Sequence, residues 1–196
     1  MVFVLVCYKF SFSRKDRAWL VGGLAFTVGA DWFLVINNSH LPGVAIFCFA
    51  HVCYICRGLN AECRFAFGLF GVVGLIAFTG FLAESIFILA GLYGVLFFIN
   101  ICVYVFKKTH LPRCNHALML VGLIFFALCD FNVLLYNLPL YFEVNFFSDV
   151  SYLLIWIFYL PSQALIAISG LKPLGKTLGE TFSEEKVSPK PPSKRL

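Results

Sequence analysis

The chain has 196 residues, of which 61% are hydrophobic and only 13% are charged, and its mean hydropathy is +0.89. These values exclude a soluble domain of average composition and are typical of a membrane protein with several spans. The formal net charge of +5 comes from lysines and arginines that gather in short loops, so it indicates membrane orientation and gives no reason to expect a nucleic-acid partner.

Six apolar segments approach or exceed the roughly 18 to 20 residues that a membrane-spanning helix needs. Short loops join them, so residues 1–170 are predicted to form one all-α domain, a polytopic transmembrane helical bundle. The six predicted spans are 18–37, 42–56, 65–83, 86–106, 116–138 and 149–169. Ahead of them, residues 1–12 form an apolar segment too short to cross a membrane unaided, which we expect to be an interfacial helix or the end of a further span.

The lysines and arginines are confined to one set of loops. Every one lies before the first predicted span, after the second, after the fourth or after the sixth, whereas the opposite loops carry Glu84, Glu143 and Asp149. Since Lys and Arg in short loops mark the cytoplasmic side, both chain ends are predicted to lie in the cytoplasm. The small size and the one-sided charge suit a bacterial inner membrane. Residues 171–196 have too little apolar surface to fold alone, so we predict a disordered basic tail.

The eight cysteines lie mostly inside the predicted spans, where cysteine behaves as a small apolar residue. Cys53 and Cys56 have the spacing of a metal-binding pair. A structural zinc site needs four ligands, however, and no second pair lies at a matching distance. We therefore expect no metal bound by these thiols.

Two spans carry an aspartate in the same pattern, GLxFxxxxD. The pattern occurs at residues 23–31 and again at 122–130, so that it ends at Asp31 and at Asp130. The following span carries His51 in the first case and Gln163 in the second. Both units start on the same side of the membrane, so they are predicted to be parallel repeats, which place a site at the repeat interface. A carboxyl within a span is costly and indicates a functional site.

Helix geometry places these four polar side chains at compatible depths. With about 1.5 Å of rise per residue, all four fall in the middle and outer half of the bundle. Each run that holds an aspartate ends at an asparagine, Asn37 in the first and Asn137 in the second. Any one of these residues taken alone is equally well explained as a packing device that hydrogen-bonds across helices. Together they predict a site.

The sequence contains, in this order, the stretches GADWFLVI, LPGVAIFCFAHVCYI, LCDFNVLLYNL and IWIFYLPSQALIAIS. In order and spacing they resemble the YhhN/TMEM86 family of multi-span membrane proteins, whose characterised members are lysoplasmalogenases, and the resemblance covers residues 18–169. Asp31 and Asp130 match the two aspartates of the family. The chain departs from the family at Ala30, where glycine is typical. Members also commonly have more spans, so we expect a shorter branch or a truncated N-terminus.

Two further family motifs are matched by pairs of residues. The family's histidine with a tyrosine three residues on is matched by His51 and Tyr54, and its aromatic-then-glutamine motif by Tyr159 and Gln163. The resemblance implies hydrolysis of the vinyl-ether bond of a lysoplasmalogen, which yields a fatty aldehyde and a glycerophospho-base. The expected partners are therefore a lysophospholipid substrate and membrane lipid, and no cofactor is expected.

A vinyl ether is cleaved by protonating its outer vinyl carbon and letting water attack the oxocarbenium ion that forms. This needs one protonated carboxylic acid and one carboxylate, a division that two aspartates in a low-dielectric bundle supply. We predict Asp31 and Asp130 as the catalytic pair, with His51 orienting a carboxylate or relaying a proton. The predicted substrate-binding residues are Tyr54, Tyr159, Gln163, Asn37 and Asn137.

Three alternatives stay open at this point. His51 and the two aspartates offer three ligands for a zinc ion. Parallel repeats with carboxylates near the membrane midplane also describe a small-molecule or lipid carrier without catalysis. A purely structural membrane subunit would use its aspartates for stability alone. Whether the chain forms a homo-oligomer is also open.

Overall fold

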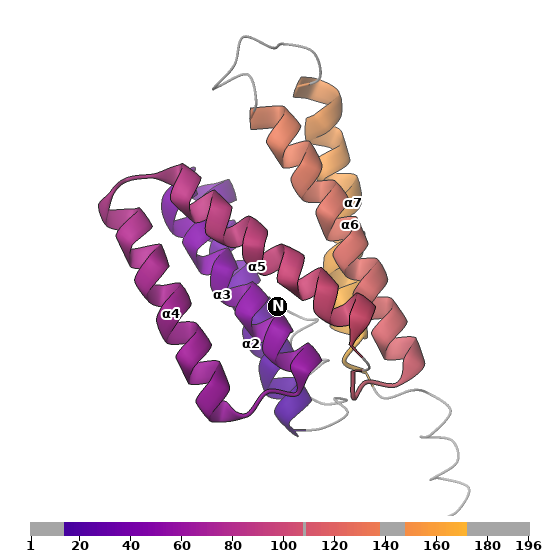
Figure 1. The fold of residues 1–196 in the computed structure, drawn as a ribbon. Helices are drawn as coiled ribbons and strands as arrows, with labels where there is room; N and C mark the ends of the chain where they lie inside the picture. The colour runs from indigo at the N-terminus through magenta and orange to yellow at the C-terminus, as the bar shows by residue number, and fades with distance from the viewer. Residues whose placement is uncertain (1–13, 108, 138–147, 172–196) are drawn as a thin grey trace, which may run out of the picture.

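The computed structural model describes residues 14–107, 109–137 and 148–171. The helices of this part, drawn in Figure 1, are α2 (Arg14–Asp31), which continues into a π-helix η1 (Trp32–Ile36), α3 (His40–Leu59), α4 (Cys63–Leu82), α5 (Ile86–Phe106), α6 (Arg113–Asn137) and α7 (Ser148–Ile168). With η1 joined to α2, these are six helices, each long and apolar enough to cross a membrane. The predicted all-α transmembrane bundle is therefore confirmed. The predicted segment 1–12 and, from residue 172 onward, the predicted tail lie outside the described residues.

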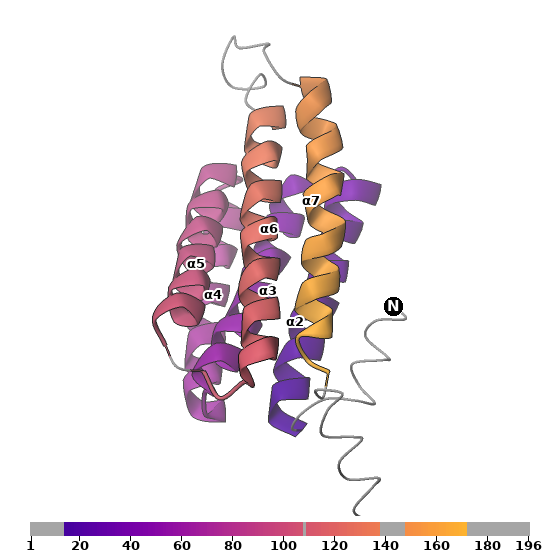
Figure 2. The same ribbon diagram turned by 90° about the vertical axis from the view of Figure 1, so that its right-hand side faces the viewer.

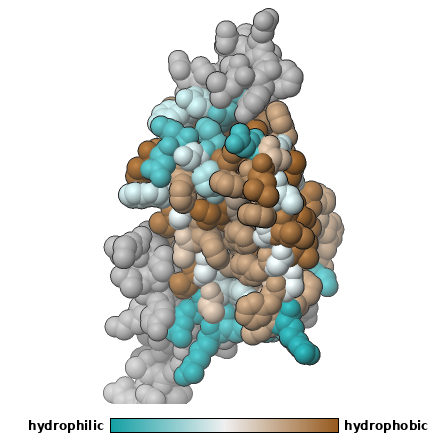
Figure 3. Space-filling model, turned by 90° about the vertical axis from the view of Figure 1, so that its left-hand side faces the viewer, coloured by the Kyte–Doolittle hydropathy of each residue, from teal (hydrophilic) through white to brown (hydrophobic). Residues whose placement is uncertain are grey.

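The outer surface of the bundle carries the apolar side chains that a lipid environment favours. Large apolar residues of α4 and α5 are exposed, among them Phe67 (78%) and Phe106 (82%). Figure 3 shows a broad hydrophobic band with hydrophilic residues gathered at both ends. Because a helix satisfies its backbone hydrogen bonds internally, it can place such a surface against lipid. The chain is an integral membrane protein.

Helix α3 is the central helix of the bundle. It packs against α2, α4 and α5, and nearly every residue of its second half is buried. Helices α6 and α7 lie side by side in both views of the ribbon, and they extend beyond the other helices at the upper end (Figures 1 and 2). The chain thus forms a close α6–α7 pair beside a group of four helices centred on α3.

The bounds predicted for the second span were wrong at both ends. The prediction was 42–56, whereas α3 runs from His40 to Leu59. Pro42 lies in the first turn, where its missing N–H removes no helical hydrogen bond. Arg57 lies in the last turn and is nevertheless fully buried. Asn60 ends the helix in the left-handed conformation, with φ of 50°, which asparagine adopts more easily than most residues.

A buried ion pair and its hydrogen bonds join three helices and the residue after a fourth, at the end of the bundle where α3 ends. Arg57 Nε lies 2.8 Å from Asp16 Oδ1, and neither side chain is exposed. The guanidinium also donates to Ser169 Oγ at 2.7 Å and to Ser169 O at 2.9 Å, and Asn115 Nδ2 donates to the same carbonyl at 2.8 Å. Residues of α2, α3 and α6 and the residue after α7 therefore meet in one polar group, called the Arg57 cluster below.

Glycines let paired helices approach closely at corresponding positions of the predicted repeat. Gly23 in α2 packs against the ring of Tyr54 in α3. A Cβ atom at Gly122 in α6 would lie 2.9 Å from Ile166 Cγ1 and 3.2 Å from Ile166 N in α7. Small residues at helix contacts are typical of membrane bundles. The two aligned glycines thus have the same structural role in the α2–α3 and α6–α7 pairs.

Candidate functional site

A large apolar cavity lies at the end of the bundle where η1 and α6 end and where α3 and α5 begin. Its volume is about 800 Å³, and residues of α2, η1, α3, α5, α6 and α7 form its wall. Most of these residues are aliphatic or aromatic. Among the described residues, those that line the cavity with a carboxyl, imidazole, amide or phenol group are Asp31, His40, Tyr93, Asp130, Asn137 and Tyr159.

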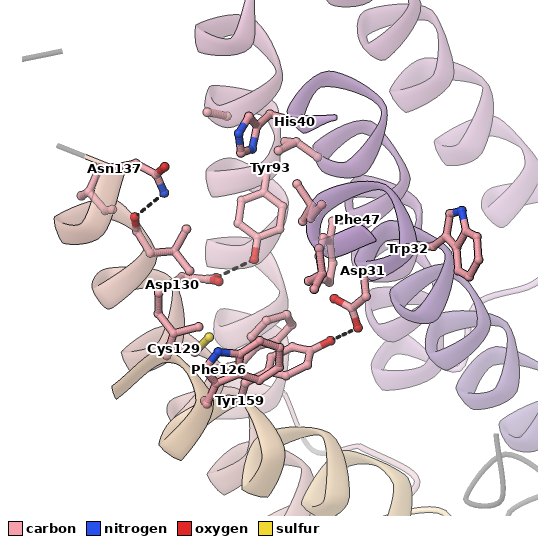
Figure 4. A pocket seen from close by; sticks show the side chains of 18 of the residues that line it. Asp31, Trp32, His40, Phe47, Tyr93, Phe126, Cys129, Asp130, Asn137 and Tyr159 are labelled. Atoms are coloured by element: carbon pink, nitrogen blue, oxygen red, sulfur yellow. Dashed lines mark hydrogen bonds between the residues drawn. The ribbon is translucent and has the colours of Figure 1, made fainter. Parts of the chain in front are cut away.

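Asp31 and Asp130 face this cavity from different helices (Figure 4). Asp31 is the last residue of α2, and it accepts a hydrogen bond from the hydroxyl of Tyr159 in α7. Asp130 in α6 accepts one from the hydroxyl of Tyr93 in α5 at 2.5 Å. Both aspartates are half-buried. Each carboxyl is therefore paired with a phenol that reaches it from another helix.

The chain changes from α-helix to π-helix directly after Asp31. The π-helical turn ends at Ile36, and the backbone N–H of Asn37 bonds to Trp32 O at 3.1 Å. The next turn closes through the N–H of Ser39, which bonds to Phe33 O at 2.8 Å. Single π-helical turns are rare and occur frequently at functional sites. Here the turn forms part of the wall of the cavity.

Contacts between aromatic rings hold the two tyrosines in place. The ring centroid of Phe126 lies 6.0 Å from that of Tyr159 and 5.8 Å from that of Phe47. Phe47 in turn contacts Tyr93, with centroids 6.1 Å apart. Because edge-on and tilted contacts restrict ring rotation, the two hydroxyls stay directed at the two carboxyls.

Among the described residues that line the cavity, none is a lysine or an arginine that could balance the two carboxyls. The sequence has neither residue in 18–56, 65–106 or 114–171, and these stretches supply every described residue of the wall. A charge in apolar surroundings is costly unless it is paired or hydrogen-bonded. The two phenols therefore give the stabilisation that Asp16 receives from an arginine. Two carboxyls in one apolar space are the groups that acid/base catalysis uses.

The sequence matches the YhhN family over residues 1–170, which include every described helix. This chain belongs to the YhhN family. The resemblance seen in the sequence is thereby confirmed at the level of the family. No curated protein and no solved structure matches the chain.

Four predicted site residues of this YhhN protein line the cavity: Asp31, Asp130, Tyr159 and Asn137. Asn137 is the last residue of α6, about two turns beyond Asp130, and its Nδ2 donates to Val133 O at 2.8 Å. The structure thus brings together the two predicted catalytic aspartates and two of the predicted substrate-binding residues.

His51 of this YhhN protein lies behind the cavity wall. Its ring is fully buried, and its centroid lies 5.0 Å from that of Tyr93 and 5.8 Å from that of Phe126. Its Nδ1 lies 3.2 Å from Nδ2 of Asn100 in α5, and its Nε2 has no hydrogen-bond partner among the described residues. The histidine therefore packs against the tyrosine that binds Asp130 and does not itself line the cavity.

Three predicted substrate-binding residues lie away from the cavity wall. Tyr54 is fully buried, with its hydroxyl 3.4 Å from Thr27 Oγ1. Gln163 Nε2 donates to Ser162 Oγ at 3.4 Å, and its Oε1 is buried without a partner in the described part of the chain. Asn37 is exposed at the end of η1. The structure therefore places none of these three side chains in the cavity wall.

Sequence reasoning missed Tyr93 and His40, both of which line the cavity. Tyr93 stands alone in the apolar run ILAGLYGVLFF, and nothing along the chain relates it to Asp130 until α5 and α6 are placed. His40 belongs to the polar corner NNSHLPG. The position of that corner, directly before a predicted span, was the signal that could have found His40.

The zinc alternative does not fit the geometry. Among the residues that the structure describes, no three His, Cys, Asp or Glu side chains come together as metal ligands. The rings of Tyr93 and Phe126 contact His51 and also line the cavity, so these rings stand between His51 and the cavity. The donor set that zinc needs is therefore not assembled by His51 and the two aspartates.

Proposed function

We propose that this YhhN protein hydrolyses the vinyl-ether bond of lysoplasmalogens and releases a fatty aldehyde and a glycerophospho-base. The observation that carries the proposal is the pair of aspartates, Asp31 and Asp130, that share one large apolar cavity. An alkenyl chain needs an apolar space, and cleavage of its ether bond needs two carboxyl groups. The resemblance to lysoplasmalogenases supplies the substrate class.

The cavity wall reaches the lipid-facing surface of the bundle. Val28, Trp32 and Val35 line the cavity and are themselves more than half exposed, at 55%, 56% and 54%. A lipid substrate can therefore pass sideways from the bilayer into the cavity. Its alkenyl chain stays in apolar surroundings on this route, so no hydrophobic cost opposes it.

In the proposed reaction, one aspartic acid donates its proton to the outer vinyl carbon, which forms a C–H bond and leaves an oxocarbenium ion. The other aspartate, as a carboxylate, accepts a proton from the water molecule that attacks the carbon next to the ether oxygen. The hemiacetal then breaks the C–O bond to the glycerol oxygen. That oxygen takes up a proton, and the hemiacetal hydroxyl loses one. One water is consumed, and both carboxyls return to their starting state.

We assign the acid and base roles to the two aspartates together and not to either one alone, because two coupled carboxyls share their protons. Tyr159 and Tyr93 are proposed to fix the orientation of Asp31 and Asp130 during these steps, as their hydrogen bonds support. His51 is proposed to act through Tyr93, against which its ring packs. It is therefore a positioning residue in this proposal.

The same proposal places the protein in a bacterial inner membrane with both termini in the cytoplasm. The confinement of Lys and Arg to one set of loops supports this orientation. The cavity then lies toward the outer face of the membrane, since the loops that join the helices at its end carry none of the basic residues.

Aldehyde release from a lysoplasmalogen by the purified full chain in detergent tests the proposal. Asp31→Asn and Asp130→Asn are each expected to lower the rate by about a hundredfold or more, because general acid–base catalysis contributes on that order. Glu84→Gln is the matched control, since Glu84 is an exposed acid in the loop between α4 and α5. The control is expected to keep the rate of the parent.

Two outcomes contradict the proposal in different ways. If folded Asp31→Asn and Asp130→Asn proteins release aldehyde as fast as the parent, the aspartates are not the catalytic pair. If the parent binds lysoplasmalogens and releases no aldehyde from any of them, the chain is a lipid-binding or carrier protein without this chemistry. Gel filtration of each variant in detergent shows whether it is folded.

A further inference from the structure

The cavity has a polar mouth that the proposed acid/base chemistry does not use. His40, the first residue of α3, and Asn137, the last residue of α6, line this part of the wall. In Figure 4 both side chains lie above the two carboxyls, whereas Phe126 and Tyr159 lie toward the bottom of the cavity. His40 is exposed, so it is accessible from the aqueous side of this end.

His40 is the one basic residue that the sequence offers to this mouth. No lysine or arginine occurs in 18–56, 65–106 or 114–171, which include all loops of this end. His51 is fully buried behind the wall. His110, in the connection from α5 to α6, and His116, in the first turn of α6, belong to the opposite end. Among the described residues that line the mouth, His40 is therefore the one with a basic side chain to meet an anionic group of a ligand.

The spacing between mouth and carboxyls suits a lysophospholipid. Asn137 lies two helical turns, or about 10 Å, beyond Asp130. In a lysoplasmalogen, six bonds of about 1.5 Å separate the oxygen-bearing vinyl carbon from phosphorus, so an extended chain spans roughly 7 Å between them. With the vinyl ether at the level of Asp31 and Asp130, phosphorus therefore lies about 3 Å short of the level of Asn137, a gap that a hydrogen bond of about 2.9 Å to a phosphate oxygen spans.

We propose that His40 binds the phosphate of the substrate's head group, with the amide of Asn137 beside it. This inference rests on the proposed function and names the residue that selects phosphate-bearing vinyl ethers. A protonated imidazole forms a charge-assisted hydrogen bond to a phosphate oxygen, roughly twice as strong as a neutral one. Asn137 uses its Nδ2 toward Val133 O, and an amide nitrogen carries a second N–H that is available to a ligand.

The kinetic test uses two vinyl ethers of equal chain length, a lysoplasmenylethanolamine and the corresponding 1-alkenylglycerol without phosphate. His40→Gln keeps a polar side chain and removes the basic imidazole. The variant is expected to lower kcat/KM about tenfold for the phosphate-bearing substrate, chiefly through KM, and to leave the alkenylglycerol unchanged. Ser39→Ala is the matched control, because Ser39 is the neighbouring residue and its Oγ donates to Asn37 O at 3.3 Å. It is expected to affect neither substrate.

A binding measurement separates this inference from the proposed reaction. Trp32 and Trp156 line the cavity, so tryptophan fluorescence reports its occupation by non-hydrolysable alkyl-ether analogues. The parent is expected to bind a 1-O-alkyl lysophosphoethanolamine about tenfold more tightly than the matching 1-O-alkylglycerol. His40→Gln is expected to remove this preference. Inorganic phosphate has no chain to fill the cavity, so it is not expected to displace the lipid analogue.

The outcomes distinguish the two proposals. If His40→Gln weakens both analogues equally, or weakens neither, the head-group inference is overturned even where the parent releases aldehyde. If inorganic phosphate displaces the analogue, His40 belongs to a site for free anions, and the head-group assignment is again overturned. If the phosphate preference depends on His40 in a protein that releases no aldehyde, the head-group site stands and the proposed hydrolysis falls.

Discussion

Two phenols stabilise the carboxyls of the cavity in place of ion pairs. Tyr159 reaches from α7 to Asp31, and Tyr93 reaches from α5 to Asp130. The first bond joins the first and last helices of the described bundle, whereas the second joins two consecutive helices. A hydrogen bond to a charged group contributes about 1.5 to 3 kcal/mol net. Each phenol therefore fixes a carboxyl and joins two helices at the same point.

Removing either hydroxyl is expected to reduce the rate more than the stability. Tyr93→Phe and Tyr159→Phe keep the rings that pack against Phe47 and Phe126, but each leaves a carboxyl free to rotate. We expect aldehyde release to fall about tenfold, which corresponds to about 1.4 kcal/mol in the activation barrier. Steady-state kinetics and thermal unfolding in detergent measure the two effects. Tyr152→Phe is the control, since Tyr152 is 53% exposed. Unchanged kinetics in both variants would limit the tyrosines to a packing role.

The sequence was sufficient to find Asp31 and Asp130, but it could not identify the residues that bind them. A carboxyl inside an apolar span stands out because burying it is costly. Tyr93 does not stand out, because a tyrosine in a span is ordinary and its partner depends on which helices become neighbours. His51 was as conspicuous as the aspartates, yet its imidazole contacts Asn100 and the ring of Tyr93. Side-chain polarity reveals that a partner is needed without revealing which one.

The helix pairs α2–α3 and α6–α7 depend on close contacts at Gly23 and Gly122. At Gly122 the neighbours of an added Cβ include backbone atoms, Ile166 N and Ser162 O, both at 3.2 Å. Backbone atoms cannot rotate away as a side chain can. A methyl group at this position therefore needs α6 and α7 to shift apart.

Gly122→Ala is expected to destabilise the protein by about 1 to 3 kcal/mol, the usual cost of overpacking a close contact. Gly91→Ala and Gly94→Ala are matched controls on α5, because an added Cβ at either position meets no atom within 4 Å. The controls are expected to leave stability unchanged or slightly raised, since alanine is the better helix former. Thermal unfolding in detergent compares the three variants. Equal melting temperatures would show that the α6–α7 contact tolerates separation.

Helix positions were predicted well, and helix ends were predicted poorly. Apolar length alone located all six spans, because a bilayer demands about 20 apolar residues. The predicted end of α3 is wrong because an arginine after an apolar run indicates a loop, whereas the guanidinium of Arg57 is satisfied inside the bundle by Asp16 and Ser169. The π-helical turn after Asp31 was also not foreseen. Both features depend on contacts between helices and leave no periodic pattern in the sequence.

The two ends of the whole bundle are built differently. At one end, the Arg57 cluster joins α2, α3, α6 and the residue after α7 through buried hydrogen bonds. At the other end, the same helices surround an apolar cavity of about 800 Å³. The first end therefore holds the helices together, and the second provides the space for a ligand.

Arg57→Leu is expected to lower the free energy of unfolding by about 3 to 5 kcal/mol, because it removes the guanidinium partner of the buried Asp16. The free energy of unfolding of Arg57→Lys should lie between those of the parent and Arg57→Leu, since lysine keeps the charge and loses the planar donor geometry. Arg64→Gln is the control at an exposed arginine of the same end. Unfolding by heat in detergent measures all three. A melting temperature for Arg57→Leu equal to that of Arg64→Gln would contradict the role given to the cluster.

The aligned positions of Gly23 and Gly122, and of Asp31 and Asp130, have a consequence for how such a site can evolve. Two identical chains related by a two-fold axis must give both carboxyls the same surroundings. Two repeats within one chain are free of this constraint, and here Asp31 receives its hydroxyl from α7 whereas Asp130 receives one from α5. The predicted internal repeat would thus leave two carboxyls of equivalent position free to acquire different surroundings, which the proposed division into acid and base requires.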